Sequence, residues 1–259
     1  MLNVREFGST GPLLVILHGL FGDSSNWRGI AKKFSVNHHV LVVDLPAHGS
    51  SPLLPMDYEN MAIALKDTIF HTSERRCSLL GHSMGGKTAM SFSLLFPNIL
   101  EKLIIIDIAP KLYPLMHERI FQGMQAVANQ CVSSKSEADK ILEHFESNSV
   151  IRLFLLKNLL RTENGTYHWR IDISYIYRFY KSICSWEVPQ NRKNCSFSGP
   201  ALFMYGTKST YIQKEDIPLI KSFFPNATFF AMEGSGHWPH AESPEQFFQI
   251  THAFLDTRE

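Results

Sequence analysis

Excess charge of either sign and long apolar runs are both scarce in this sequence of 259 residues. Its 25 lysines and arginines nearly balance 24 aspartates and glutamates, so the net charge of +1 gives no reason to expect nucleic acid or an anionic membrane as a partner. The apolar run at 13–17 is far shorter than the roughly 20 residues that a membrane span needs, and no signal peptide pattern opens the chain. We expect a cytoplasmic protein with a small-molecule partner.

Paired cysteines are also missing. The four cysteines form no C-x-x-C pair and have no histidine nearby at zinc-finger spacing, so they predict free thiols in a reducing compartment. They are Cys77, Cys131, Cys184 and Cys195. The sequence indicates no metal and no organic cofactor, and the expected assembly is a monomer or a small homo-oligomer.

Short apolar runs alternate with segments of helical periodicity in the first part of the chain. Runs that are apolar on both faces suit parallel strands covered by helices. The runs lie at 13–17, 40–44, 78–82 and 103–107, and the helical segments between them at 26–34, 58–70 and 84–96. This alternation predicts an α/β fold with a doubly wound, mostly parallel sheet flanked by helices.

The alternation of strand and helix patterns ends after Pro110. The segment 111–195 is typical of helices, broken by a turn at "TENGTY". Strands are expected again at 201–206 and 228–234, followed by a last helix that opens with a capping box at Ser243-Pro244-Glu245-Gln246. The sequence therefore predicts a core formed by 1–110 and 196–259, interrupted by an all-helical cap at 111–195.

The strongest chemical motif is Gly81-His82-Ser83-Met84-Gly85. A G-x-S-x-G pattern is weak evidence by itself, but here an expected strand enters it and an expected helix leaves it, as in a nucleophile elbow. Such a turn lifts the Ser83 hydroxyl above the sheet at a helix N-terminus, where the dipole favours developing negative charge. Ser83 is the candidate nucleophile, and the alternative is a glycine-rich turn with an incidental serine.

A serine hydroxyl needs a base to take its proton, and 12 histidines compete for this role. His237 is the best placed, because it follows the last strand in a glycine-rich loop at the carboxyl end of the sheet, where such folds assemble their sites. The chain order of serine before histidine also fits. His240 is the competitor, and His82 is expected to pack or to stabilise the turn.

An oxyanion hole requires backbone N–H donors that are fixed in advance. The amide of Met84, directly after the candidate nucleophile, is one. The glycine-punctuated loop at 17–27 should supply the other from Leu20 or Phe21. We favour Leu20 because it directly follows His18-Gly19.

These motifs together resemble the α/β-hydrolase superfamily over nearly the whole chain. The stretches "HGLFGDSSNW", "GHSMGGKTAM", "LIIIDIAP" and "GHWPHAE" are similar, more closely, to those of the YbfF-like esterases. The resemblance implies hydrolysis of short acyl esters and acyl-CoA thioesters.

The expected acid is missing from its usual place. In most of the superfamily it follows the strand that here is 201–206, but the loop beyond has neither aspartate nor glutamate, and Glu215 and Asp216 come too late. Asp107 ends the buried strand after the elbow helix, where surface solvation would not explain it. A carboxylate there could reach His237 from the neighbouring strand tip, although Asp-x-x-Pro is also common in turns.

The resemblance also assigns roles to two further residues. The YbfF-like family carries its acid after the strand that ends at Asp107 and has a serine at the older position. Ser209 would therefore be an auxiliary hydrogen-bonding partner of the histidine or the acid, with a plain turn serine as the alternative. Asp44 resembles the structural aspartate that members of the superfamily place before a tight turn.

The sequence thus predicts a serine carboxylesterase or thioesterase with Ser83, His237 and Asp107 as its triad. Carbon–carbon hydrolases share this layout, and a ligand receptor on the same scaffold can retain a triad, so both remain alternatives. Aromatic and apolar residues of the cap suggest an acyl pocket: Phe154, Leu155, Leu156, Tyr175, Tyr177, Phe179 and Trp186. Cations that could meet the phosphates of an acyl-CoA are Lys87, Lys111, Arg119, Arg152 and Arg161.

Overall fold

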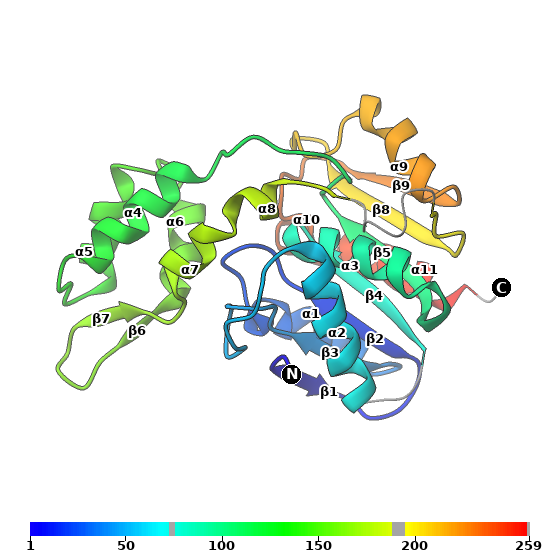
Figure 1. The fold of residues 1–259 in the computed structure, drawn as a ribbon, viewed down its shortest axis with the longest axis horizontal. Coiled ribbons are helices and arrows are strands. Elements are labelled where there is room, and N and C mark those ends of the chain that lie inside the picture. Colours follow the sequence, from blue (N-terminus) through cyan, green and yellow to red (C-terminus); the bar gives the residue numbers. More distant parts are fainter. Residues whose placement is uncertain (73–75, 188–194, 258–259) are drawn as a thin grey trace.

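A seven-stranded sheet forms the centre of the molecule in the computed structural model, which describes residues 1–72, 76–187 and 195–257. The strand order is β1-β3-β2-β4-β5-β8-β9, and every neighbouring pair is parallel except β1 and β3 (Figure 1). The strands are β1 (Val4–Phe7), β2 (Leu13–Leu17), β3 (His39–Val43), β4 (Cys77–His82), β5 (Leu100–Ile106), β8 (Ala201–Gly206) and β9 (Ala227–Met232). The predicted mostly parallel sheet is confirmed. The sequence reasoning missed β1, because this edge strand lacks an apolar run.

Helices cover both faces of the sheet, as its doubly apolar strands require. In β2, Leu13, Val15 and Leu17 point into the larger core cluster, beneath α2 and α3, while Leu14 and Ile16 pack with residues of α1 and α11. The helices of these layers are α1 (Arg28–Phe34), α2 (Tyr58–Thr72), α3 (Met84–Leu95), α9 (Ile217–Phe223), α10 (Pro239–Glu242) and α11 (Pro244–Asp256), with 3-10 turns η1 (Ser24–Trp27), η2 (Pro97–Ile99) and η5 (Lys214–Asp216).

The start of the last helix differs from the prediction. Pro244 is its first residue, as expected, but Ser243 makes no side-chain capping bond within the described part of the chain. Its hydroxyl instead lies 3.2 Å from the hydroxyl of Ser235. The predicted capping box is therefore wrong, because tertiary packing gives the serine another partner.

The segment 118–184, called the insert below, lies beside the sheet layers (Figure 1). It contains α4 (Glu118–Ala128), α5 (Lys135–Glu143), α6 (Ser149–Leu155), η3 (Leu156–Asn158), α7 (Ile173–Arg178) and α8 (Tyr180–Cys184). It also contains a hairpin of β6 (Leu159–Arg161) and β7 (Tyr167–Trp169). The prediction of an all-helical insertion is therefore wrong. Strands of only three residues give no periodic signal, although Gly165, at φ 85°, is the residue that such a turn demands. Residues 188–194 of the predicted cap lie outside the described ranges.

Lys87 of α3 contacts both chain segments that join the insert to the core. Its side chain is buried, and Nζ donates to the carbonyls of Lys111 (2.8 Å), Cys184 (3.1 Å) and Ser185 (2.7 Å). Residue 111 lies where the chain leaves the core, and residues 184 and 185 lie where it returns. One ammonium group therefore holds both crossings against the helix that follows Ser83.

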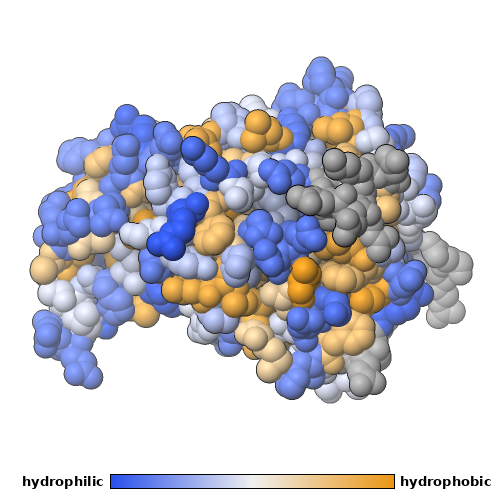
Figure 2. All heavy atoms as spheres, in the orientation of Figure 1, coloured by the Kyte–Doolittle hydropathy of each residue, from blue (hydrophilic) through white to orange (hydrophobic). Residues whose placement is uncertain are grey.

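The outer surface mixes polar and apolar residues. On the face shown in Figure 2, orange apolar atoms are visible between the insert and the sheet layers, among polar ones. Among the helices in the described ranges, none is both long enough and apolar enough to cross a membrane.

Candidate active site

Ser83 occupies a strained turn between β4 and α3. Its φ of 53° and ψ of −117° are unusual for a residue with a side chain. The flanking glycines are sterically required, because a Cβ on Gly81 would lie 2.3 Å from the carbonyl oxygen of Gly85, and one on Gly85 would lie 2.5 Å from that of His18. The elbow geometry expected from the motif is thus present, and it places Ser83 at the N-terminus of α3.

His237 and Asp107 come together at the carboxyl edge of the sheet. His237 Nδ1 lies 2.7 Å from Asp107 Oδ2, although the two residues are 130 positions apart. Asp107 directly follows β5, is completely buried and has a φ of 50°. The amide of Gly206 approaches its other oxygen at 3.3 Å. Since the acceptor is a carboxylate, Nδ1 carries the proton, which leaves Nε2 of His237 free to act as a base.

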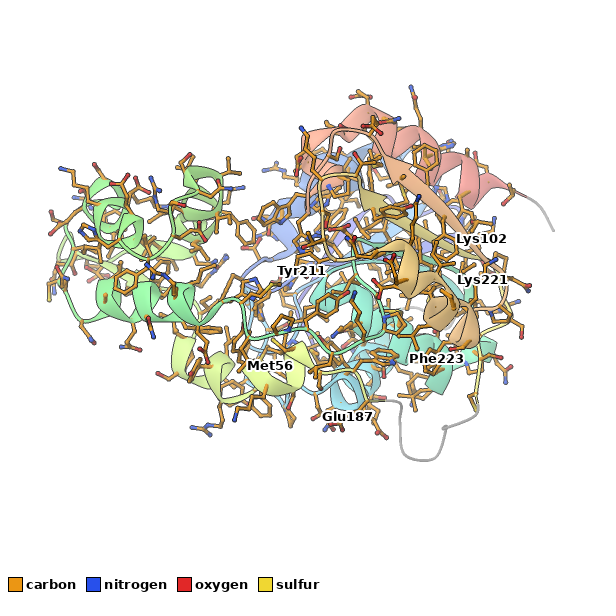
Figure 3. All side chains as sticks on the ribbon, turned by 90° about the horizontal axis from the view of Figure 1, so that it is seen from above. Met56, Lys102, Glu187, Tyr211, Lys221 and Phe223 are labelled. Carbon is orange, nitrogen blue, oxygen red and sulfur yellow. The ribbon has the colours of Figure 1, made fainter. Side chains whose placement is uncertain are left out.

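Ser209 and Tyr211 complete the surroundings of this pair. The Ser209 hydroxyl donates to Asp107 Oδ2, and the amide of Tyr211 donates to the same hydroxyl at 3.2 Å. The Tyr211 ring stacks on the His237 ring, with centroids 3.8 Å apart and planes 18° from parallel. Figure 3 shows Tyr211 at the junction between the insert and the sheet layers. The sequence reasoning included Ser209 but missed Tyr211, since an aromatic residue in a loop carries no pattern.

The competing histidines have other contacts. His240 stacks on Trp27 with ring centroids 4.2 Å apart, and His82 Nε2 lies 2.8 Å from the carbonyl oxygen of His237. His82 therefore supports the loop that carries His237, which agrees with the turn-stabilising role expected for it. Of the two histidines weighed as base, His237 is the one that contacts Asp107.

The remaining carboxylates also have separate partners. Asp216 forms an ion pair with Lys111 at 2.5 Å. Asp44 accepts from the amides of Ser24 at 2.6 Å and Ser50 at 2.9 Å, so it fixes the turn after β3. These contacts suit the structural role expected for Asp44 and the exclusion of Asp216.

The two candidate oxyanion amides in the loop after β2 differ in their hydrogen bonding. The amide of Phe21 donates to His48 Nε2 at 3.0 Å, so it is already engaged. His48 Nδ1 in turn lies 2.9 Å from the carbonyl of Pro46, which fixes the tautomer that accepts from Phe21. Phe21 as a donor to an oxyanion is therefore wrong, and Leu20 and Met84 remain. No local pattern in the sequence marks this role of His48, because it depends on contacts between segments.

Burial shapes the electrostatics of the site. Removal from water lowers the pKa of His237, with a further decrease from nearby His117, so the imidazole is neutral and able to accept a proton. Burial also raises the pKa of Asp107, while the hydrogen bonds from Ser209 and Gly206 act in the opposite direction. Burial lowers the pKa of His48 to about 3, which keeps it a neutral acceptor for the Phe21 amide.

Two cavities meet at Ser83. The larger, of about 230 Å³, lies between the core and the insert, and its lining includes His237, Trp238 and Phe154. The smaller, of about 40 Å³, is lined by Leu20 and Met84 among others. Ser83 lines both of them, so a group attached to its hydroxyl could extend in two directions.

The expected acyl pocket is only partly made of the predicted residues. Phe154 and Leu155 line the larger cavity, but five others do not line either cavity at Ser83: Leu156, Tyr175, Tyr177, Phe179 and Trp186. Sequence reasoning overestimated the pocket because insert residues mostly pack against one another.

Most of the proposed phosphate-binding cations have partners within the protein. Lys87 is buried among carbonyls and Lys111 pairs with Asp216. Arg119 donates to the carbonyls of His144 and Phe145, and buried Arg152 pairs with Asp139 at 2.8 Å. Arg161, an exposed residue of β6, is the remaining member of that set.

The sheet order, the serine elbow after β4 and the histidine loop after β9 define the α/β-hydrolase architecture. A family model described as alpha/beta hydrolase fold matches residues 12–244, so the chain belongs to that family. The chain is 33% identical over 246 residues to "Esterase YbfF" of Escherichia coli, covering 94% of this chain and 92% of that protein. The resemblance to the YbfF-like esterases is confirmed.

Two further comparisons agree. The "sn-1-specific diacylglycerol lipase ABHD11" of Mus musculus is 35% identical over 262 residues, covering 98% of this chain and 84% of that protein. A solved structure titled "Marine microorganism esterase" superposes with a TM-score of 0.91 at 37% identity and covers 98% of both chains. Family membership and these relatives support a hydrolase.

Proposed function

We propose that the protein is a serine esterase that cleaves acyl esters and acyl-CoA thioesters through an acyl-enzyme. The observation that carries the proposal is the 2.7 Å contact between His237 Nδ1 and Asp107 Oδ2, beside a cavity that Ser83 and His237 both line. A serine elbow, an oriented histidine and a buried carboxylate are the parts that acyl transfer through serine requires.

In the proposed mechanism, His237 Nε2 takes the proton of Ser83 as the hydroxyl attacks the acyl carbonyl. Asp107 holds the imidazole in the required tautomer and stabilises the imidazolium. The amides of Leu20 and Met84 stabilise the oxyanion. His237 then returns the proton to the leaving alcohol or thiol, and a water molecule repeats the sequence to release the acid.

The two cavities suggest how the substrate is divided. The leaving group must receive its proton from His237, which lines the larger cavity and not the smaller one. The acyl chain would then enter the smaller cavity, beside the proposed oxyanion donors Leu20 and Met84. Its 40 Å³ has room for about three water-sized groups, which favours short acyl chains. The insert would act as the cap over both.

The first test is the loss of turnover on removing the proposed nucleophile. Ser83→Ala should reduce ester hydrolysis by at least ~10³-fold, because the proposed acyl-enzyme forms on the Ser83 hydroxyl. Asp107→Asn should approach that loss, since the amide would orient the wrong tautomer of His237. Asp216→Asn is the matched control and should change kcat/KM little. A loss below ~10³-fold in Ser83→Ala would refute the mechanism.

A substrate panel separates the alternatives. Hydrolysis rates would be measured for aryl esters and acyl-CoAs of increasing chain length, and for ring-fission diketones, with Ser83→Ala as the blank. Highest activity on short acyl esters or thioesters supports the proposal. Turnover of the diketones alone would indicate a carbon–carbon hydrolase. A single acylation event without sustained turnover on any ester would indicate a ligand receptor.

A further inference from the structure

A buried asparagine of the insert contacts the loop that carries the proposed oxyanion donor. Asn158, at the end of η3, is 1% exposed, and its Nδ2 donates to the carbonyl oxygen of Phe21 at 2.7 Å. The two residues are 137 positions apart in the chain. This bond is therefore a tertiary link between the insert and the loop after β2.

Arg170 determines which way the Asn158 amide faces. Asn158 and Arg170 flank the open end of the hairpin, where the backbone N–H of Arg170 donates to the carbonyl of Asn158 at 2.8 Å. The Arg170 guanidinium donates to Asn158 Oδ1 at 3.1 Å, so Nδ2 must be the atom that faces Phe21. The same guanidinium pairs with Asp23, which caps η1 on the core side.

Phe21 is a strained residue whose two backbone groups are both held by side chains. Its φ of 62° lies in the left-handed region, which costs energy for a residue other than glycine. His48 accepts from its N–H in the core, while Asn158 donates to its C=O from the insert. Leu20 directly precedes it, so the orientation of the Leu20 amide depends on how Phe21 is held.

We propose that Asn158 is a positioning residue that holds the oxyanion loop from the insert, in the orientation that Arg170 imposes. This inference rests on the proposed esterase function and adds a part of the insert to its machinery. The Leu20 amide must point at the oxyanion before the reaction begins, because donors that reorganise during the step contribute less. Loss of the Asn158 bond should therefore weaken transition-state binding more than substrate binding.

The test compares turnover with the binding of a transition-state mimic. A trifluoromethyl ketone reacts with Ser83 as its Oγ–C bond forms, the carbonyl electron pair moves to oxygen and His237 takes the serine proton. The affinity of this adduct therefore depends on the oxyanion donors. For Asn158→Ala we expect a ~10-fold or greater fall in kcat, a matching rise in the inhibition constant of the ketone and a nearly unchanged KM.

Three further variants make the result specific. Asn129→Ala, an exposed asparagine at the end of α4, is the control and should match the wild type. Asn158→Asp keeps the shape and the Arg170 partner but places a carboxylate oxygen, which cannot donate, opposite the Phe21 carbonyl, so it should lose at least as much as Asn158→Ala. Arg170→Lys keeps a cation for Asp23 but not the fixed guanidinium, and should show a smaller loss in the same two quantities. The Arg170→Lys variant still tests the proposal if an Asn158 variant does not fold.

The outcomes are distinct. Wild-type kcat and ketone affinity in the folded variants would overturn the proposal. So would an equal weakening of KM and ketone affinity, which would show a general packing role. Failure of the esterase function would instead appear as unchanged hydrolysis in Ser83→Ala, whatever the Asn158 variants do.

Discussion

Asp107, the proposed acid, lies one strand away from the position where an acid was expected from the resemblance to the superfamily. Asp107 follows β5, while the loop after the neighbouring β8 contributes the hydroxyl of Ser209. Because β5 and β8 are adjacent and parallel, both strand ends lie at the same edge, and either can reach His237. Ser83 and Asp107 both have positive φ, and such strain is typical of functional turns.

The prediction at the scale of residues concerns Ser209. Its hydroxyl donates to the carboxylate oxygen that also meets His237 Nδ1, so it should stabilise the ionised form of Asp107. We expect Ser209→Ala to lower kcat several-fold, corresponding to about 1 kcal/mol for one hydrogen bond. The matched control in steady-state kinetics is Thr210→Ala, on the adjacent exposed residue. Wild-type turnover in Ser209→Ala would show that this serine only forms a turn.

At the scale of elements, α3 has two separate tasks. Its N-terminus presents Ser83, and one turn later Lys87 holds the carbonyls of both chain segments that join the insert to the core. Asn158, which directly precedes the hairpin of the insert, contacts the loop after β2. The insert is therefore attached at its ends through Lys87 and along its inner side through Asn158.

The prediction at this scale is a loss of stability in Lys87→Met. Methionine fills a similar volume but donates no hydrogen bond, so the buried carbonyl of Cys184 and the partly buried carbonyls of Lys111 and Ser185 would lose this partner. Each buried acceptor left unpaired costs about 1–3 kcal/mol of unfolding free energy. Urea unfolding would measure the effect, with exposed Lys181→Met of α8 as control. Equal stability of the two variants would show that Lys87 does not anchor the insert.

At the scale of the whole molecule, the site exists because core and insert close over it. The larger cavity is lined by His18 and His237 from the core and by Ile151 and Phe154 from the insert. This enclosure leaves the His237 side chain only 16% exposed. The desolvation that lowers the pKa of His237 is therefore a property of the assembled molecule rather than of the loop alone.

The corresponding prediction concerns pH dependence. Proposed catalysis requires neutral His237, so kcat/KM should fall as the pH drops through the pKa of this residue in the free enzyme. Because burial lowers that pKa from the ordinary value of 6.5, the acid limb should have its midpoint below pH 6.5. Initial rates on a neutral ester would locate it, with circular dichroism at each pH to establish that the fold persists. A midpoint at or above 6.5 would contradict control by His237 and would indicate protonation of Asp107, whose pKa burial raises.

Patterns within short segments predicted much of the molecule. The run at 13–17 and the segment 84–96 correspond to β2 and α3. The glycines around Ser83 indicated the elbow, because a strained turn leaves no room for side chains at those positions. Short or exposed elements left no such pattern, so β1 and the hairpin β6–β7 were missed. Ser243 met every local rule for a cap and still found another partner, since tertiary contacts outweigh a single local bond.

The sequence by itself determined the α/β order and the candidate residues Ser83, His237 and Asp107, because local periodicity and turn chemistry are encoded within a few residues. The tertiary structure alone decided that Phe21 gives its amide to His48, which leaves Leu20 as the candidate donor in that loop. It alone brought Asn158 to the same loop. Hydrogen bonds between segments more than 20 residues apart depend on how the chain packs in space, and no local pattern in the sequence records them.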